Sequence, residues 1–271
     1  MSLGTRGLAG LTAGLYGLLG GLLFALPGAL APAFAWKVSP FVTMTIGGWC
    51  LGNAWLAALV AWRGRWRLVY STLLYLGLFG LLEAGVLVAF RAKLAPGHPV
   101  AWLYVAALAS NVMLAAVAGI EWLMRRPARV QFGARPGCAD RAFVAAFFIF
   151  VAFLAGYSLL APIGAPGTNG GIFPEVMSAF TLRSFAAFYL ALALGAIPLA
   201  LENSVSPGLH HGWASLGLIV IITLAALVNI RLFDFAARPG GLAYIGAYVI
   251  VGIPVASVLL LRGTGTRDKV P

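Results

Sequence analysis

Long apolar segments alternate with short polar connections along the chain. Eight such segments are found, at residues 8–31, 41–62, 68–90, 100–124, 142–162, 180–201, 212–233 and 241–261. Each is long enough to cross the roughly 30 Å hydrocarbon layer of a bilayer, which takes a helix of about 20 mostly apolar residues. None alternates polar and apolar positions as the strands of a membrane β-barrel do. The pattern predicts an all-α integral membrane bundle of eight transmembrane helices.

The first segment also has features of a secretory signal peptide. Arg6 precedes the apolar run, and small residues at Ala29, Ala31, Ala33 and Ala35 follow its core. The run 8–31 is, however, longer than the roughly 7–15 apolar residues of a signal-peptide core. We therefore interpret it as a membrane span.

Composition excludes the other protein classes. The 271 residues are 62% apolar and 9% charged, and 34 of them are glycine. Soluble globular proteins are roughly 45–50% apolar and about 25% charged. A chain with so few charges cannot cover a water-exposed surface, which excludes a soluble fold, intrinsic disorder and a disulfide scaffold. Cys50 lies inside a predicted span and Cys138 outside, so no disulfide is expected.

The basic residues are distributed unequally between the two sides of the predicted membrane. One side holds Arg6, Arg63, Arg65, Arg67, Arg125, Arg126, Arg129, Arg135, Arg141, Arg262, Arg267 and Lys269. The other holds Lys37, Arg91, Lys93, Arg183, Arg231 and Arg238. Because Lys and Arg are retained on the cytoplasmic side, we expect both termini in the cytoplasm and the protein in a bacterial-type inner membrane.

A net charge of +11 would indicate nucleic-acid binding in a soluble protein. Here most of the excess positive charge lies on the predicted cytoplasmic face. There, attraction to anionic lipid headgroups favours membrane binding by about 1 kcal/mol per basic residue. The candidates for this lipid contact are Arg63, Arg65, Arg67, Arg125, Arg126 and Arg129. We expect membrane lipids as partners, and no nucleic acid.

The two halves of the chain share a weak pattern. Gly21 and Pro27 near the end of the first span match Gly156 and Pro162 in the fifth. The entry Phe34–Ser39–Phe41 into the second span matches Phe173–Ser178–Phe180 at the sixth. We call the separation between Phe34 and Phe173 the repeat offset. The matches predict two parallel four-helix repeats, residues 1–131 and 132–271, and parallel repeats disfavour the inverted-repeat transporter folds.

One stretch resembles a pattern found in other membrane proteins. It runs from Phe173-Pro174 through Arg183 and Ala186-Ala187-Phe188 to Leu190-Ala191-Leu192. It resembles an uncharacterised family of bacterial polytopic membrane proteins, in which an aromatic-Pro loop leads into an Arg-bearing helix. Glu175 and Ser178 stand where that pattern favours Trp and Thr. The resemblance covers a small part of the chain and implies the architecture without an activity.

Few ionisable residues lie inside the predicted spans. Glu83 lies roughly 10 Å from the outer end of its helix, at a rise of 1.5 Å per residue. Arg183 and Arg231 lie at the outer ends of the sixth and seventh spans. An ionisable residue in a span costs about 2.5–3.5 kcal/mol on insertion scales and therefore indicates a function. We expect Glu83 to lie within salt-bridge reach of Arg183 or Arg231.

Two interpretations of this pair are open. It forms an outward-facing polar vestibule that binds a solute or relays a proton, or it is an interhelical ion pair that orients helices. The ion pair is the simpler interpretation, because Glu83 has no second acid or metal ligand nearby in the sequence. Asn53 and Asn111, near mid-membrane, either form interhelical hydrogen bonds, worth about 0.6 kcal/mol each, or line a cavity. Glu121 is expected to pair with Arg125 at i+4.

Glycines in the first two spans are spaced to form small-residue faces. They are Gly10, Gly14, Gly17 and Gly21 in the first span, and Gly48 and Gly52 in the second. Such faces allow helices to approach closely. We expect them to serve packing inside the bundle.

Several cofactors and chemistries are excluded by residue placement. His98, His210 and His211 all fall in predicted connections, so axial haem ligands are lacking in the spans. Lys37, Lys93 and Lys269 also lie outside them, which excludes a retinal Schiff base. The pair His210-His211 is expected to be a polar loop, not a metal site. No hydrolase or metalloprotease motif is found, and we expect no metal, cofactor or enzymatic activity.

Two functions from different classes remain. The first is a non-enzymatic accessory, scaffold or assembly subunit that packs against other membrane proteins, lipids or pigments. The second is a small-solute or ion transporter that uses Glu83 and Arg183. A transporter is expected to have a polar cavity that reaches mid-membrane, whereas an accessory subunit is expected to be a closed bundle.

Overall fold

The computed structural model describes residues 1–127, 135–160, 171–201 and 205–263. Within these ranges every regular element is a helix. In chain order they are α1 (Leu3–Ala25), α2 (Pro27–Leu30), η1 (Ala31–Ala33), α3 (Pro40–Arg63), α4 (Trp66–Ala89), η2 (Arg91–Lys93), α5 (Pro99–Arg125), α6 (Cys138–Leu160), α7 (Ala179–Ala200), α8 (Val205–Val228), η3 (Ile230–Leu232) and α9 (Gly240–Gly263). Eight of the described helices are long and apolar enough to cross a membrane. The chain is thus a multi-pass helical membrane protein, as the sequence predicts.

Two predicted spans have wrong boundaries. Helix α1 begins at Leu3, where the Ser2 hydroxyl accepts a hydrogen bond from the Thr5 amide at 3.2 Å, and it ends before Pro27. Pro27 has no amide hydrogen to continue the helix and instead starts α2. Helix α8 begins at Val205, well before the predicted start at Gly212, and it therefore contains the His210-His211 pair that the sequence pattern assigns to a loop. Both histidines are buried.

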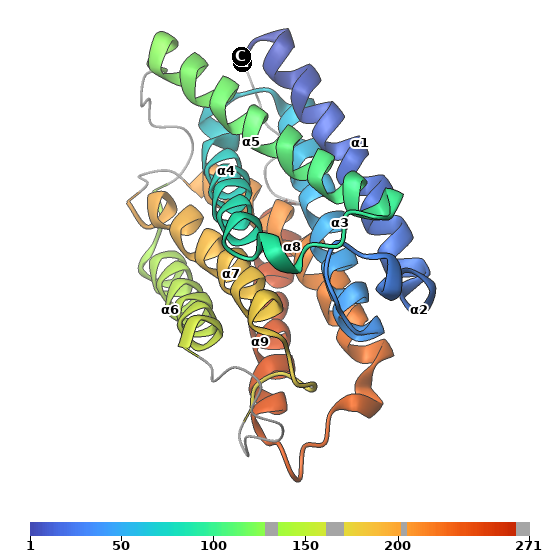
Figure 1. The fold of residues 1–271 in the computed structure, drawn as a ribbon. Helices are drawn as coiled ribbons and strands as arrows, with labels where there is room; N and C mark the ends of the chain where they lie inside the picture. Colours follow the sequence, from blue (N-terminus) through green and yellow to red (C-terminus); the bar gives the residue numbers. More distant parts are fainter. Residues whose placement is uncertain (128–134, 161–170, 202–204, 264–271) are drawn as a thin grey trace.

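Four helices form the centre of the bundle. Helix α3 packs against α1 and α8, and α7 packs against α6 and α4. Helix α5 lies against α4 and α1, and α9 lies against α8. In Figure 1, α1 lies at the right of the bundle and α6 at the left, with α3, α4, α7 and α8 between them. The predicted boundary between the two halves, at 131/132, lies outside the described residues, as does Pro162.

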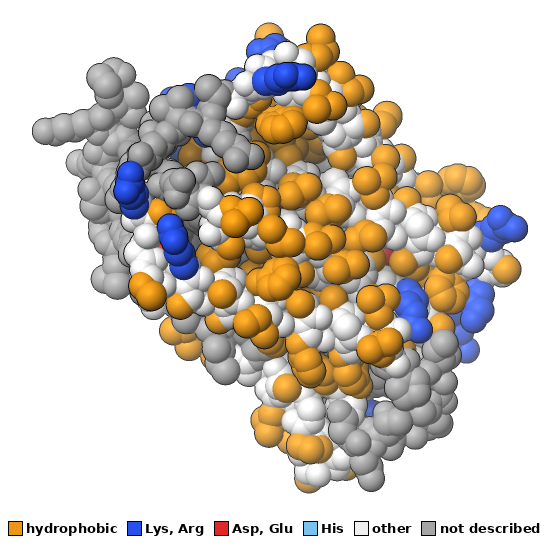
Figure 2. All heavy atoms as spheres, turned by 90° about the vertical axis from the view of Figure 1, so that its left-hand side faces the viewer, with side chains coloured by type: hydrophobic (Ala, Val, Ile, Leu, Met, Phe, Trp, Pro, Cys, Tyr) orange, Lys and Arg blue, Asp and Glu red, His pale blue; other side chains and the backbone are white. Residues whose placement is uncertain are grey.

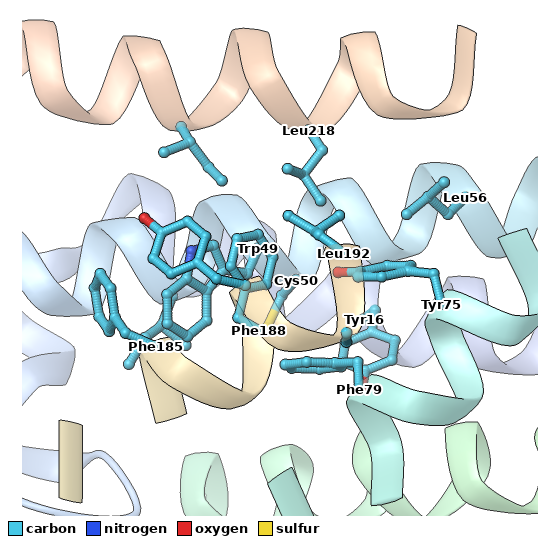
Figure 3. Close-up of a cluster of buried hydrophobic side chains, with 14 of the residues drawn as sticks. Tyr16, Trp49, Cys50, Leu56, Tyr75, Phe79, Phe185, Phe188, Leu192 and Leu218 are labelled. Carbon is cyan, nitrogen blue, oxygen red and sulfur yellow. The ribbon is translucent and has the colours of Figure 1, made fainter. Parts of the chain in front are cut away.

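Aromatic rings fill the centre of the bundle. Trp49 of α3 stacks on Phe188 of α7, with ring centroids 4.6 Å apart and planes 8° from parallel. Figure 3 shows these rings with Phe185, and with Tyr75 and Phe79 of α4, inside the helices. The cluster removes large apolar surfaces from contact with lipid, and its offset and edge-on ring contacts are the favourable aromatic geometries.

The outer surface is apolar. Large hydrophobic side chains point outward from most of the long helices, among them Leu18, Trp102, Ile149 and Leu224. Figure 2 shows a face covered with hydrophobic side chains, with Lys and Arg gathered towards its margins. Such a surface is suited to contact with lipid.

Five of the six predicted lipid-contact arginines are exposed at one end of the bundle, which we call the basic end. They are Arg63, Arg65, Arg67, Arg125 and Arg126, while Arg129 lies outside the described residues. Arg6 ties α1 to this end, because its Nε donates to the carbonyl of Ala61 at 2.8 Å. The chain leaves α3 through Gly64, whose φ of 57° lies in the left-handed region that favours glycine.

Glu121 joins the basic ends of α1 and α5. Its carboxylate accepts hydrogen bonds from the Ser2 amide at 2.6 Å, the Ser2 hydroxyl at 2.8 Å and the Thr5 hydroxyl. It also pairs with Arg125, Nε to Oε1 at 3.0 Å, which confirms the predicted i+4 pair. The carboxylate therefore stabilises the bundle mainly by accepting hydrogen bonds that join α1 to α5.

We expect Glu121→Ala to lower the free energy of unfolding by about 1–3 kcal/mol, because hydrogen bonds to a charged acceptor are lost. Arg125→Ala is expected to lower it by less than about 1 kcal/mol, because an exposed ion pair contributes little. Unfolding in mild detergent, followed by circular dichroism, measures both. Equal losses in the two variants would contradict the role given to Glu121.

Candidate functional site

The carboxyl group of Glu83 lies where α4, α5 and α7 meet. It is fully buried. Tyr104 of α5 donates its hydroxyl to Oε1 at 2.6 Å, and Ser184 of α7 donates to the same oxygen at 2.9 Å. The second oxygen, Oε2, has no hydrogen-bond partner among the residues that the structure describes. One half of this buried carboxyl is thus held by two donors and the other half is left unpartnered.

The expected ion pair of Glu83 with an arginine is not formed. In the described part of the chain, the salt bridge found is Glu121–Arg125. Arg183 points away from Glu83 and donates to the carbonyl of Ser158 on α6 at 2.7 Å. Successive residues on a helix point about 100° apart, so Arg183 faces α6 when Ser184 faces α4. Arg231 lies exposed in η3.

Aromatic side chains cover Glu83 on the side of the α4–α5 connection. Phe34 and Trp36 from the segment before α3 lie against Tyr104, with ring centroids 5.3 and 5.5 Å away. Trp36 also stacks on Phe180 of α7 at 4.3 Å, and its indole nitrogen donates to the Thr181 hydroxyl at 3.2 Å. We call Phe34, Trp36, Tyr104 and Phe180 the aromatic cap. The cap separates the carboxyl from that end of the bundle.

Polar groups continue from Glu83 along α4 towards the basic end. Ser71 and Tyr75 are four positions apart and Tyr75 and Glu83 are eight apart, so at 100° per residue the three lie within about 120° of one another around the helix. The Tyr75 hydroxyl donates to Asn53 Oδ1 on α3 at 2.8 Å. The Ser71 hydroxyl donates to the carbonyl of Gly195 on α7 at 2.9 Å and lies 3.1 Å from Nδ1 of His211. We call Ser71, Tyr75 and Glu83 the polar face of α4.

Asn53 and Asn111 both make interhelical hydrogen bonds. Besides the bond from Tyr75 to Asn53, Asn111 Nδ2 donates to the carbonyl of Leu76 on α4 at 2.8 Å and to the Tyr16 hydroxyl on α1 at 3.4 Å. Each amide nevertheless keeps one buried atom without a partner in the described residues, Nδ2 of Asn53 and Oδ1 of Asn111. The packing interpretation thus accounts for half of each side chain.

The partners of Glu83 are not apparent in the sequence. Tyr104 lies near the start of a predicted span, where tyrosine is common at membrane interfaces, so its position alone indicates no function. Ser184 is next to Arg183 in the sequence, and a charged residue at the end of a span is a stronger indication of function than a serine. His211 falls in a predicted loop because the apolar pattern places the start of α8 too late. A helical projection of the fourth span, which aligns Tyr104 with Asn111, is the signal that could have found Tyr104.

The described residues contain no cluster of three or more His, Cys, Asp or Glu side chains that could hold a metal ion. The Glu83 carboxyl accepts two hydrogen bonds on Oε1, and a carboxyl group can also exchange a proton. The resemblance noted for the segment from Phe173 to Leu192 stays a prediction. Comparison of the chain with protein-family models, curated proteins and solved structures found no match.

Proposed function

We propose that the protein is a membrane transporter that carries a proton on Glu83. The observation that carries this proposal is the carboxyl itself, which is fully buried in the bundle with Oε2 unpartnered. No arginine or lysine of the described residues lies within salt-bridge distance of it. In this role the Glu83 carboxyl releases a proton and takes one up again in each transport cycle.

The energetics of burial support this role. An ionised carboxylate buried without a cation is strongly unfavourable, whereas a neutral carboxyl with hydrogen bonds is tolerated. With Tyr104 and Ser184 donating to Oε1, the proton of a neutral Glu83 belongs on Oε2. Loss of this proton would leave a buried charge with two hydrogen-bond donors on Oε1 and none on Oε2 among the described residues. Proton release therefore requires the site to open, which links protonation to conformation.

The polar face of α4 supports a route to the basic end. From Ser71 to Glu83 the helix rises about 18 Å at 1.5 Å per residue, a large part of the membrane thickness. Phe79 lies between Tyr75 and Glu83 and interrupts the line of polar groups. The polar groups do not form a continuous path in this state, so transport would require a rearrangement of the bundle.

The accessory-subunit hypothesis also has an observation in its favour. The aromatic cap closes the site, and the outer face is apolar and suited to contact with other membrane proteins as well as lipid. Under this hypothesis Glu83 is a neutral packing residue. The two hypotheses differ in whether the purified chain moves protons without a partner.

Reconstitution tests the proposal. The purified protein is placed in vesicles that contain a pH-sensitive dye, and a potassium gradient with valinomycin sets the membrane potential. We expect proton flux above that of empty vesicles of the same lipid composition. Flux equal to that of empty vesicles would overturn the proposal. Mass spectrometry of the protein purified in mild detergent would then identify a stoichiometric partner if the accessory hypothesis holds.

A further inference from the structure

Several helix contacts made in the first half have counterparts in the second. Helix α3 packs on α8 as α7 packs on α4, and the outer pairs α1–α3 and α6–α7 correspond. Short helices η2 and η3 follow α4 and α8 at positions separated by the repeat offset. Ser39 and Ser178, separated by the same offset, each cap the helix that follows by accepting a bond at 3.2 Å from the amide three positions on.

Aromatic contacts repeat at the same offset. Phe34 meets the edge of Tyr104 at 5.3 Å and 70°, and Phe173 meets Tyr244 at 5.8 Å and 64°. Phe34 and Phe173 define the repeat offset, and the separation of the two tyrosines differs from it by a single position. These paired contacts match Tyr244 of α9 in the second half with Tyr104 of α5 in the first.

The centre of the bundle indicates where an axis between the halves would run. Trp49 and Phe188 are separated by the repeat offset, and they stack on each other in nearly parallel planes. Two equivalent residues touch each other when both lie beside a two-fold axis. An axis that relates the halves would therefore run between α3 and α7. This axis would relate the α4–α7 interface to the α8–α3 interface. Glu83 lies at the first of the two.

We propose that the halves are related in this way, and that Ile222, Thr45 and Tyr244 form a second copy of the Glu83 site, in which isoleucine replaces the acid. The repeat offset matches Glu83 with Ile222 and Thr45 with Ser184. Ile222 is fully buried against α3, where a Cβ built on Gly48 would lie 3.5 Å from its Cγ1.

Without an acid at residue 222, the hydroxyl groups of Thr45 and Tyr244 have no carboxyl group to which they could donate. Thr45 donates back to the carbonyl of Phe41 on its own helix at 2.9 Å. The buried Tyr244 hydroxyl lies beside the hydrogen-bonded hydroxyls of Tyr189 and Tyr248 and makes no close hydrogen bond of its own among the described residues. At the first site the corresponding hydroxyls both donate to Glu83. The second site thus keeps the donors of the first and lacks its acceptor.

In the proposed second site isoleucine fills the position of the acid, so we expect the matching interface around Glu83 to pack without an ionised carboxyl. The second site is a feature of the architecture and is present whether or not Glu83 moves protons across the membrane.

The test restores the acid at the second site of the full-length protein. We expect Ile222→Glu to fold, and its infrared spectrum to contain a second C=O stretching band of a neutral carboxyl at neutral pH. Adding Tyr244→Phe is expected to shift this band, because the donor is removed, and to leave the Glu83 band unchanged. Ile219→Glu, one turn away on α8, is the matched control, and its introduced carboxyl is expected to be insensitive to Tyr244→Phe.

Two results would overturn the proposal. One is an Ile222→Glu protein that fails to fold, since a true copy of the site accommodates the acid. The other is a folded variant whose new band does not respond to Tyr244→Phe. The measurement uses protein in lipid nanodiscs and no transport assay, so a failure of the proposed proton transport leaves its outcome unaffected.

Discussion

Glu83→Gln is expected to reduce proton flux through reconstituted vesicles to the level of empty vesicles. The amide has the shape of the acid, and its oxygen can still accept the bonds from Tyr104 and Ser184. It cannot take up and release a proton at the position of Oε2. The change therefore removes the proposed chemistry while it preserves the packing. Flux is read from the lumenal dye after the membrane potential is set.

Asp234→Asn is the matched control for this variant. Asp234 is exposed, and its Oδ1 accepts a hydrogen bond from the Ala237 amide at 3.0 Å, which asparagine can also accept. The control removes one acid from the same chain outside the bundle, and we expect its flux to equal that of the unmodified protein. Glu83→Gln vesicles with unchanged flux would show that Glu83 is not the carrier of the proton.

Gly20→Ala is expected to destabilise the bundle by about 1–3 kcal/mol or more, the range of overpacked cores. Helices α1 and α3 cross so closely at this residue that a Cβ would lie 2.7 Å from the Leu51 amide nitrogen and 2.9 Å from the Gly47 carbonyl oxygen. Backbone atoms cannot move aside as side chains do, so the two helices would have to separate. Titration with a denaturing detergent measures the loss.

The next residue provides the control. A Cβ on Gly21 would meet nothing within 4 Å. Gly21→Ala is expected to leave stability unchanged or to raise it by up to about 1 kcal/mol, because alanine favours a helix over glycine. Similar effects of the two substitutions would contradict the close crossing of α1 and α3 at Gly20.

The eight spans could be predicted because membrane insertion depends on local hydropathy, which the sequence carries directly. The contacts between spans could not. Gly10, Gly14, Gly17 and Gly21 form the regular stripe in the first span, but the close approach to α3 is at Gly20, and of the four only Gly17 lies near α3, where a Cβ would be 3.8 Å from Ala54 Cβ. In a chain with 34 glycines, spacing alone does not select the face that meets a neighbour.

Glu83 could be identified because a carboxyl in a span is costly wherever it lies. Its surroundings depend on helix rotation, which the sequence does not give. The sequence places Arg183 at the correct end of its span, yet this arginine faces α6, and the adjacent Ser184 meets Glu83. The predicted start of α8 is too late because His210 and His211 are polar, and polar residues indicate a connection between spans. The folded bundle buries both histidines.

We propose that Glu83 is a neutral acid inside the bundle that exchanges its proton. Infrared difference spectroscopy of the unmodified protein against Glu83→Gln, in nanodiscs at neutral pH, tests it most directly. We predict a C=O stretching band of a neutral carboxyl that is lost in Glu83→Gln and that shifts when the solvent is changed to heavy water. A spectrum in which the two proteins do not differ in this region would contradict the claim.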